Sequence, residues 1–291
     1  MNCYNGSKYL NESLKSIVDQ TYKNWELLFW DNKSTDDSKD ILKSFNEYRF
    51  KYYLSPKFTN LGEARYLASK YISGDLLAIL DTDDIWLPNK LEEQIKIFYK
   101  DQTLGLIYTN TIFFDNRNSN ILYKKKQNSG YIFSDLLFNY NISLETVLIN
   151  LKYKNKIKYL FDKDFEYISD FDLIVRLSKV SKFFYLDHVL AKWRMHEDNL
   201  TFKKPILFSI EKKNWLKKMM TYEKNNKKIY LQALRKYEVD YCYALMCNND
   251  FSYRDHLTIS KKALIKSILI YLNFYFPFSR SIIKKIINSK T

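Results

Sequence analysis

Apolar and polar positions in the first 114 residues follow two alternating spacings. Short, almost wholly apolar runs, typical of buried strands, are separated by stretches in which apolar residues recur every three or four positions, as on one face of a helix. This alternation predicts a mainly parallel sheet flanked by helices, which is an α/β fold. The predicted strands are 25–30, 51–54, 75–80 and 104–114, and the predicted helices are 8–20, 34–48, 61–72 and 88–99.

The pattern weakens after residue 114 and becomes helical after residue 200. Residues 145–149 and 183–186 are strand-like, and residues 171–180 are helix-like. Beyond residue 200 the chain is helical and basic. We therefore expect an α/β domain over 1–200 and a helical, basic C-terminal region over 201–291.

Charge separates the same two regions. Residues 1–200 carry 28 Lys+Arg against 27 Asp+Glu, whereas residues 201–291 carry 19 against 6, a net of +13 out of +14. A basic region of this kind favours an anionic partner, such as a membrane surface or nucleic acid, and a solvated lysine-rich face is the equal alternative. The longest apolar stretch, 263–278, contains Lys266 and Asn273, so we expect it to lie on a membrane or pack on the protein.

Composition narrows the class of protein further. Hydrophobic residues at 46% and charged residues at 27% are typical of a globular domain and exclude a disordered or low-complexity chain. Three cysteines without a CxxC pair, and an N-terminus without an apolar core segment, predict a cytoplasmic protein, peripheral on the inner face of the cell membrane if the basic region binds lipid. The sequence lacks the GxGxxG, GxxxxGK[ST] and GxSxG motifs of dehydrogenases, P-loop proteins and hydrolases.

The strongest chemical signal is the acidic run Asp81-Thr82-Asp83-Asp84, directly after the predicted strand 75–80. Three carboxylates in four residues repel one another, and a divalent cation at the carboxyl edge of a sheet would offset this repulsion. Two carboxylates spaced in this way can bind one Mg²⁺ or Mn²⁺, which then binds a diphosphate. The alternative is an acidic surface turn before a helix.

Other polar residues follow or precede neighbouring predicted elements. Asp31 and Asn32 come directly after a strand, Asn5 and Gly6 precede the first helix, and Arg65 lies in the first turns of the third. Because the carboxyl ends of parallel strands meet at one edge, these residues are expected to lie together. Helix N-termini and arginine both bind phosphate, so the edge predicts a nucleotide site.

Four sequence blocks resemble glycosyltransferase family 2 in their order and spacing. They are Tyr4-Asn5-Gly6 with Gln20-Thr21-Tyr22, then Trp30 to Asp36, then Asn60 to Arg65, then Gly74-Asp75 leading into LAILDTDDIWLPNKLEEQ. The resemblance covers roughly residues 1–200 and implies the GT-A fold, a Rossmann-like mixed, mainly parallel sheet. It also implies inverting transfer of a sugar from a nucleotide-sugar, with UDP as the favoured carrier, to a glycan or lipid-linked acceptor, using Mn²⁺ or Mg²⁺. Such reactions build cell-surface polysaccharide and lipopolysaccharide.

The resemblance also implies roles for individual residues. Asp170, in Ser169-Asp170-Phe171-Asp172, would be the general base, and a carboxylate is needed because an acceptor hydroxyl is a poor nucleophile until its proton is taken. Asp83, with Asp81 and His196, would bind the metal ion, which holds the charge of the departing diphosphate. The implied donor site consists of Tyr4, Asn5, Asp31, Arg65, Asp81, Asp83, Asp84, Arg194 and His196.

The chain departs from the family pattern at several positions. Only Met1-Asn2-Cys3 precedes the Tyr-Asn-Gly turn, where the family has a central apolar strand, so we expect a truncated first strand and hypothesise a start at an internal Met. Asn32 replaces a common Asp, Tyr66 a common Asn and Ser169 a common Glu.

Two alternative functions remain open. A nucleic-acid-binding protein would use the basic, aromatic C-terminal region, but nucleic acid is the less expected partner because it leaves the strand-end acids without a purpose. An inactive, glycosyltransferase-like module that only binds nucleotide is the other alternative.

Overall fold

Three short parallel strands lie near the start of the chain in the computed structural model, which describes residues 1–247. β1 (Asn2–Cys3) pairs with β2 (Leu27–Asp31), and β2 pairs with β3 (Phe50–Leu54). The predicted strands at 25–30 and 51–54 are thus confirmed within two residues. β1 is the edge of this three-stranded sheet and pairs only with β2 among the described strands, whereas the resemblance placed it at the centre.

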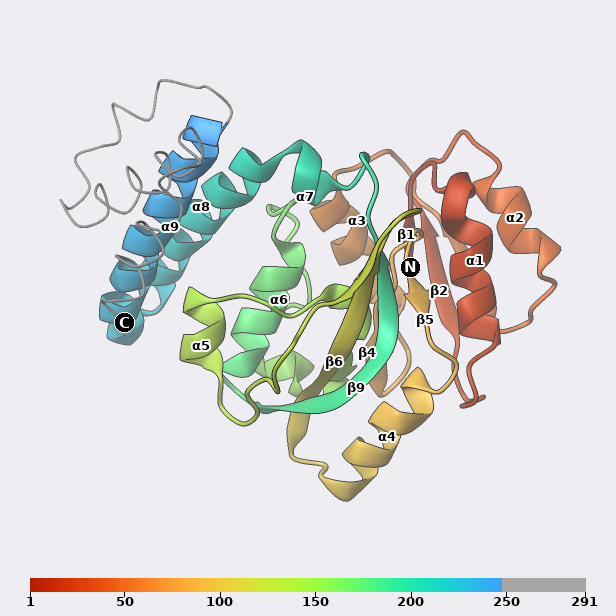
Figure 1. Cartoon of the computed structure of the whole chain (residues 1–291), viewed down its shortest axis with the longest axis horizontal. Helices are drawn as coiled ribbons and strands as arrows, with labels where there is room; N and C mark the ends of the chain where they lie inside the picture. Colours follow the sequence, from red (N-terminus) through yellow and green to blue (C-terminus); the bar gives the residue numbers. More distant parts are fainter. Residues whose placement is uncertain (248–291) are drawn as a thin grey trace. The chain divides into compact units, whose positions relative to one another are not determined.

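The apolar run of β2 is buried because helices cover both faces of the strand. Phe29 packs with Leu10 and Leu14 of α1 (Ser7–Val18), whereas its neighbour Trp30 packs with the alanines of α3 (Leu61–Ala68). Successive strand residues point to opposite faces, so one short run contacts both helices. In Figure 1, α1 and α2 (Ser38–Ser44) lie to the right of β1 and β2.

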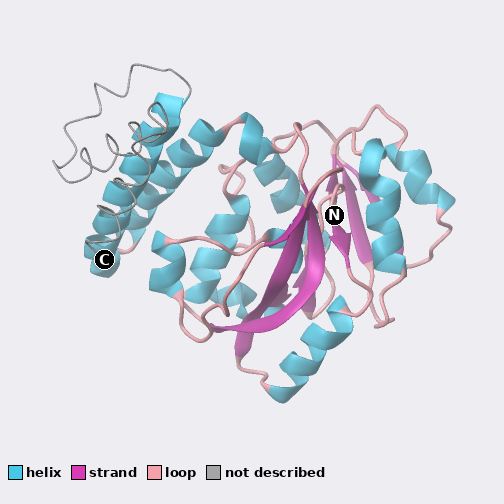
Figure 2. Cartoon of the chain, in the orientation of Figure 1, coloured by secondary structure: helices cyan, strands magenta, loops and turns pink. Residues whose placement is uncertain are grey.

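A second, six-stranded sheet has the order β4-β8-β6-β9-β5, with β7 paired to β6. Only β6 and β9 pair in parallel, and every other pair in this sheet is antiparallel. The long pair curves through the molecule in Figure 2. The strands are β4 (Leu76–Ala78), β5 (Ile85–Trp86), β6 (Leu104–Phe114), β7 (Ser119–Ile121), β8 (Leu148–Asn150) and β9 (Lys182–Arg194).

The mixed α/β fold is confirmed, but parallel pairing is less extensive than the alternating pattern predicts. β8 inserts between β4 and β6 and runs antiparallel to both, so these two predicted strands are not neighbours. β9 extends eight residues beyond the predicted end at 186, and register shifts near Asn110 accommodate its length. Strand 104–114 is confirmed at both ends.

The predicted helices of this first unit are present, with ends shifted by up to four residues, whereas the helix at 133–138 and the 3₁₀ segments at 144–146 and 151–156 were not predicted. The predicted helix 61–72 ends at Ala68 and continues as a 3₁₀ turn, Ser69–Tyr71. The helix predicted at 171–180 is buried on nearly all sides. The other elements are α4 (Lys90–Lys100), α5 (Phe133–Phe138), α6 (Ser169–Ser178) and the 3₁₀ segments Leu144–Thr146 and Leu151–Lys156.

Residues Met1–Asn199 form one compact unit, and a second begins at Leu200. The second unit contains α7 (Leu200–Lys203), α8 (Pro205–Tyr222), the 3₁₀ turn Lys224–Asn226 and α9 (Lys227–Cys247). α8 and α9 pack through Trp215 and Tyr230, whose rings meet edge to face with centroids 6.0 Å apart.

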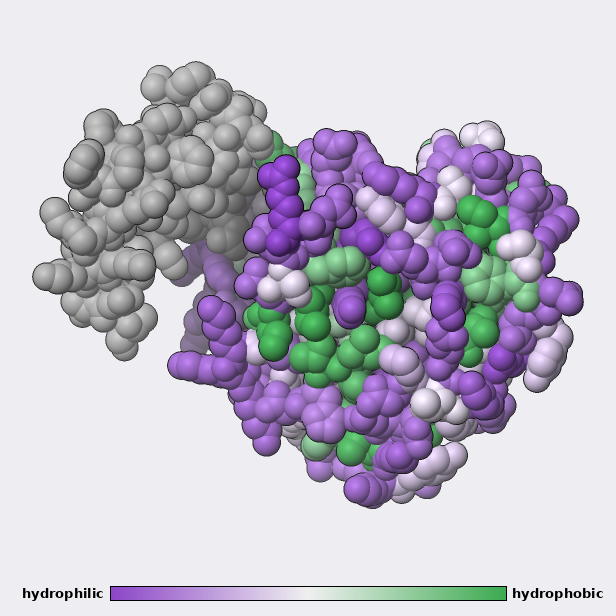
Figure 3. All heavy atoms as spheres, turned by 45° about the vertical axis from the view of Figure 1, so that its right-hand side comes forward, coloured by the Kyte–Doolittle hydropathy of each residue, from purple (hydrophilic) through white to green (hydrophobic). Residues whose placement is uncertain are grey.

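The basic region is therefore helical where the structure describes it. None of the helices within 1–247 is long and apolar enough to cross a membrane. The apolar stretch 263–278 lies outside the described residues. The face of the molecule seen in Figure 3 is mostly hydrophilic, with hydrophobic residues gathered near its middle, as is usual for a globular surface.

Candidate functional site

The acidic loop, Asp81–Asp84, follows β4 and is held in place by α1. Ser13 Oγ lies 2.8 Å from the carbonyl oxygen of Thr82 and 2.7 Å from that of Asp84. Gly6, just before α1, lies so close that a Cβ there would be 2.9 Å from Thr82 Oγ1. The Tyr-Asn-Gly turn therefore lies next to the acidic run, as predicted. The Ser13 side chain holds the loop through two of its backbone carbonyl oxygens.

Asp83 and His196 converge, although 113 positions separate them in the sequence. Asp83 Oδ2 is 2.9 Å from His196 Nε2, and the Asn199 side chain accepts a hydrogen bond from the His196 backbone N–H at 2.7 Å. His196 Nδ1 is buried and has no hydrogen-bond partner among the described residues. The other ring nitrogen, Nε2, faces the Asp83 carboxylate and also lies 3.3 Å from Asn199 Nδ2.

Charge is concentrated around Asp83. Burial and the neighbouring Asp81 carboxylate raise the pKa of Asp83 above its usual range, although His196 acts in the opposite direction. Repulsion between nearby carboxylates has this effect because it disfavours the ionised form. A carboxylate and an imidazole at this spacing form a donor pair that suits a divalent cation.

Arg194 connects the end of β9 to the acidic loop. Its Nε donates to the carbonyl oxygen of Asp83 at 3.0 Å, and its terminal nitrogen forms an ion pair with Glu12 at 2.7 Å. The guanidinium lies over the Tyr9 ring, 4.5 Å from the ring centroid. Arg194 therefore reaches the site as predicted, and Glu12 compensates its charge.

Asp84 is buried, with 3% of its surface exposed, and accepts a hydrogen bond from the Arg194 backbone N–H at 3.0 Å. Burial and the nearby Glu145 raise the pKa of Asp84 well above its ordinary value. Glu145 is itself buried and accepts from the Ser143 hydroxyl. Asp84, the last residue of the acidic loop, and Glu145 thus form a buried acidic cluster.

Lys90 is fully buried near this acidic cluster. Its Nζ donates to Gln94 Oε1 at 2.7 Å and to the carbonyl oxygen of Val147 at 3.2 Å. Burial lowers the pKa of Lys90 to about 7, with Glu145 acting in the opposite direction. The Lys90 side chain is therefore only partly protonated near neutral pH in the folded chain.

We expect the stability difference between wild type and Lys90→Met to depend on pH. The unfolded lysine binds a proton up to about pH 10, whereas the folded one releases it near 7, so stability rises with pH between these values. From pH 7 to pH 9 the free energy of unfolding of wild type should gain about 2 kcal/mol over that of Lys90→Met. Urea unfolding at both pH values measures this. The exposed Lys96→Met on the same helix should show no such gain, and parallel curves for wild type and Lys90→Met would contradict the prediction.

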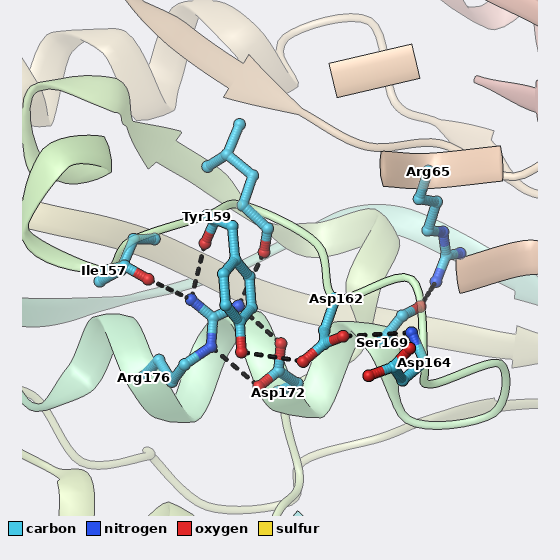
Figure 4. Close-up of polar contacts among 9 residues, drawn as sticks. Arg65, Ile157, Tyr159, Asp162, Asp164, Ser169, Asp172 and Arg176 are labelled. Atoms are coloured by element: carbon cyan, nitrogen blue, oxygen red, sulfur yellow. Dashed lines mark hydrogen bonds and ion pairs between the residues drawn. The ribbon is translucent and has the colours of Figure 1, made fainter. Parts of the chain in front are cut away.

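Arg65 joins the acidic loop to the start of α6. One terminal nitrogen donates to Asp81 Oδ1 at 3.2 Å and the other to Ser169 Oγ at 2.7 Å, as Figure 4 shows for Ser169. The arginine is 4% exposed. α3 approaches the loop before α6 so closely that a Cβ at Gly62 would lie 1.9 Å from the Phe165 carbonyl oxygen.

Asp170 lies in the first turn of α6, where Tyr140 contacts it. The Tyr140 hydroxyl donates to Asp170 Oδ2 at 3.0 Å. Burial and the Asp170 charge raise the pKa of Tyr140 well above its ordinary value, so Tyr140 remains a proton donor. The other oxygen of Asp170 accepts no hydrogen bond from the described residues.

A buried ion pair fixes α6. Arg176 donates to both carboxylate oxygens of Asp172, at 2.8 and 2.6 Å. The same guanidinium donates to the carbonyl oxygens of Ile157, Tyr159 and Leu160, as Figure 4 shows for Ile157 and Tyr159. α6 and the segment before it are therefore held together, which positions Asp170.

Asp31 and Asn5 are used within the fold at the ends of β2 and β1. Asp31 is 2% exposed and accepts from the Ser34 backbone N–H and from the Tyr52 hydroxyl, each at 2.7 Å. Asn5 has a φ of 52° and its Oδ1 accepts from the Thr35 backbone N–H at 2.8 Å. Both residues shape the strand-end turns.

Tyr4 is 52% exposed and pairs with Phe58, with ring centroids 4.6 Å apart. The pair forms an open aromatic surface at the end of β1 and beyond β3. Phe58 follows a predicted strand, but a lone aromatic residue in a loop gives no functional signal in the sequence.

Two groups of predicted residues thus converge. Asp83, Asp84, Arg194 and His196 are in contact, and Arg65 links Asp81 to the residue beside Asp170. Within 1–247, no three His, Cys, Asp or Glu side chains are grouped so as to hold a metal ion. The sequence did not single out Glu12, Phe58, Tyr140 and Asn199, and Tyr9 entered only as part of the opening block that resembles the family. Tyr9 and Glu12 lie one helical turn apart, which a search for polar pairs facing the acidic run could have detected.

The family profile described as "Glycosyl transferase family 2" matches residues 1–170. One relative is the Escherichia coli "UDP-Glc:alpha-D-GlcNAc-diphosphoundecaprenol beta-1,3-glucosyltransferase WfgD", 33% identical over 161 residues, which are 55% of this chain and 62% of that protein. Another is the Rickettsia prowazekii "Uncharacterized glycosyltransferase RP339", 32% identical over 205 residues, 68% of this chain and 63% of that one. The chain therefore spans less than two thirds of the length of these relatives.

Two solved structures share the fold at low sequence identity. S. aureus TarS 1-349 in complex with UDP-GlcNAc has a TM-score of 0.65 and 16% identity, covering 94% of this chain and 79% of that one. The mannosyltransferase PcManGT from Pyrobaculum calidifontis, in complex with GDP-Man and Mn²⁺, has a TM-score of 0.59 and 14% identity, covering 93% and 83%. With the profile match over more than half of its length, the chain belongs to glycosyl transferase family 2 and has the GT-A fold.

Proposed function

We propose that this chain transfers a sugar, with inversion, from a nucleotide-sugar donor to a hydroxyl of a glycan or lipid-linked acceptor. The observation that carries the proposal is the link between two chemical features. Asp83 and His196 lie in contact and form the proposed cation-binding pair, and Arg65 ties the same acidic loop to the start of α6, where Asp170 lies. Leaving-group stabilisation and proton removal are thus combined in one site.

A divalent cation fits the Asp83–His196 pair. The two facing atoms are a carboxylate oxygen, which suits Mn²⁺ or Mg²⁺, and an imidazole nitrogen, which favours Mn²⁺ of the two. Mg²⁺-type sites commonly take one or two protein ligands and fill the rest with substrate phosphates and water. When bound, the cation offsets the negative charge that develops on the departing nucleotide diphosphate. Asp81, which pairs with Arg65, remains a predicted third ligand.

Asp170 is the proposed general base. The Asp170 oxygen that does not bond Tyr140 takes the proton of the acceptor hydroxyl. At the same time the acceptor oxygen attacks the anomeric carbon, and the bond from that carbon to the nucleotide diphosphate breaks. The Tyr140 hydroxyl orients the carboxylate by donating to its other oxygen. Attack opposite the leaving group inverts the anomeric centre. Arg194, fixed by Glu12 and the acidic loop, is proposed to bind the diphosphate.

The proposed donor is a UDP-sugar and the proposed acceptor is lipid-linked. The names of the E. coli relative and of the TarS complex support the donor class, and the former also supports the acceptor. The exposed Tyr4–Phe58 pair offers a surface on which the uracil ring of the donor could stack, beside Asp31. The basic region 201–291 would hold the enzyme on anionic lipid near such an acceptor.

UDP binding that requires Mn²⁺ tests this function. We expect UDP and Mn²⁺ together, at 100-fold excess over the dissociation constant, to stabilise the chain by about 2.7 kcal/mol, seen as a higher melting temperature. Either component alone should give a much smaller shift. UDP release from a panel of UDP-sugars should follow. A folded chain that shows neither shift nor release would contradict the proposal, and a shift without release under any acceptor would favour the inactive module.

A further inference from the structure

We propose that Lys124, Lys125 and Lys126, called here the lysine loop, bind a phosphate or diphosphate group carried by the acceptor. The inference rests on the proposed function and adds to it the chemical class of the acceptor, which is a saccharide with an anionic group at its anomeric carbon. The lysine loop lies between β7 and α5, in a segment that the sequence pattern left unassigned.

The two residues that flank the lysine loop, Tyr123 and Gln127, are both hydrogen-bonded to Asn141. The Tyr123 hydroxyl donates to the Asn141 carbonyl oxygen, and the Asn141 side chain donates to Gln127 Oε1 at 2.9 Å. Gln127 Nε2 in turn donates to the Lys125 carbonyl oxygen at 2.8 Å. The three lysines are therefore carried on a segment with defined anchors.

The anchor is next to the proposed base. Asn141 directly follows Tyr140, whose hydroxyl donates to Asp170 at 3.0 Å. Tyr140 and Asn141 come shortly after α5, which packs beside α6, the helix that carries Asp170 (Figure 1). The lysine loop and the base are thus connected through two adjacent residues.

The charge of the lysine loop is uncompensated. All three lysines are exposed, and none forms an ion pair within residues 1–247. By contrast, the guanidinium groups of Arg65 and Arg194 pair with Asp81 and Glu12. Flexible ammonium groups without a carboxylate partner bind phosphate as point charges. The lysine loop therefore offers an anion site that the fold does not already fill.

The lysine loop is separate from the proposed donor diphosphate site. Arg194 stacks on Phe114 at one end of β6, whereas Asn110 of the same strand bonds Tyr123, at the start of the lysine loop. Four residues of strand, roughly 13 Å, separate these two contacts. An acceptor sugar whose hydroxyl faces Asp170 would meet the lysine loop with its anomeric phosphate, because Tyr140 and Asn141 connect the two. This arrangement assigns the lysines to the acceptor.

Binding of decyl diphosphate, below its micelle concentration and with UDP and Mn²⁺ saturating the donor site, tests the inference. We expect wild type to bind it, calorimetrically, with an affinity that falls as salt rises. The triple variant Lys124→Gln, Lys125→Gln, Lys126→Gln should bind at least tenfold more weakly. A matched triple variant at exposed lysines of α2 and α4, Lys39→Gln, Lys43→Gln and Lys100→Gln, should bind as wild type does.

The outcomes separate this inference from the proposed function. UDP release from UDP-sugars into water reports on the donor site and should be unchanged in the triple lysine variant. If wild type releases UDP but does not bind decyl diphosphate, or if both triple variants bind it equally, the inference is wrong while the proposed function stands. If the triple lysine variant binds decyl diphosphate as wild type does but no longer binds phosphatidylglycerol vesicles, the lysine loop belongs to a membrane contact and the inference is likewise overturned. If wild type releases no UDP, the proposed function itself fails.

Discussion

Replacing Asp83 with asparagine is expected to abolish both sugar transfer and the Mn²⁺-dependent stabilisation by UDP. The amide keeps the shape of the side chain and a hydrogen-bonding atom near His196 Nε2, but it removes the anionic oxygen that a divalent cation requires. Because burial and Asp81 already disfavour the ionised carboxylate, removing its charge relieves repulsion, and the melting temperature without ligand should not fall.

Melting curves with UDP and Mn²⁺, measured beside UDP release, check this expectation. Asp19→Asn is the matched control, because Asp19 is an exposed carboxylate paired only with Lys15 on the surface. The control should keep the full ligand-dependent shift. Wild-type activity in Asp83→Asn would rule out Asp83 as a metal ligand.

Replacing Asp170 with asparagine is expected to lower kcat for transfer by about 10²- to 10⁴-fold, the usual contribution of general base catalysis. The amide can still accept from the Tyr140 hydroxyl, so the start of α6 should keep its position. It cannot take a proton from the acceptor. Stabilisation by UDP and Mn²⁺ should therefore match wild type, which separates this variant from Asp83→Asn.

Steady-state kinetics with a fixed acceptor measure the loss. Asp164→Asn changes an exposed carboxylate on the loop that leads into α6 and should leave kcat within about twofold of wild type, as expected for a surface change. If Asp170→Asn retains kcat within the same range, the base is another residue. Tyr140→Phe should cost less than Asp170→Asn, because it removes only the hydrogen bond that orients the carboxylate.

Hydrophobic spacing was sufficient to predict the elements whose burial is decided locally. Strand Leu104–Phe114 and helix α1 have continuous apolar patterns, and the structure contains both close to their predicted bounds. Strand β8 is three residues long, and its pairing with β4 and β6 depends on partners distant in the sequence. The sequence predicts a strand at 145–149, but residues 144–146 form a 3₁₀ turn and only 148–150 form the strand. Three residues are too few to show alternation, so the place of this strand between β4 and β6 was not visible.

The candidate site shows the same division. The acidic run is a local signal, readable because its carboxylates are adjacent. The partners of these carboxylates are not local, because Asp83 and His196 are 113 positions apart and Asp84 and Arg194 are 110 apart. Family resemblance supplied Arg194, His196 and Asp170, whereas Glu12 and Tyr140 became visible only through contacts in the folded chain.

The way in which Arg176 holds the segment before α6 has a consequence for how this part of the chain can change over time. Three of the acceptors that the guanidinium uses are main-chain carbonyl oxygens, which every amino acid possesses. Substitutions at 157 and 160 are therefore restricted by packing alone, since both side chains are buried, and not by the hydrogen bonds. Asp172 and Arg176 must instead be kept or exchanged as a pair. The amino acids of the segment before α6 can therefore be substituted while the position of Asp170 is retained.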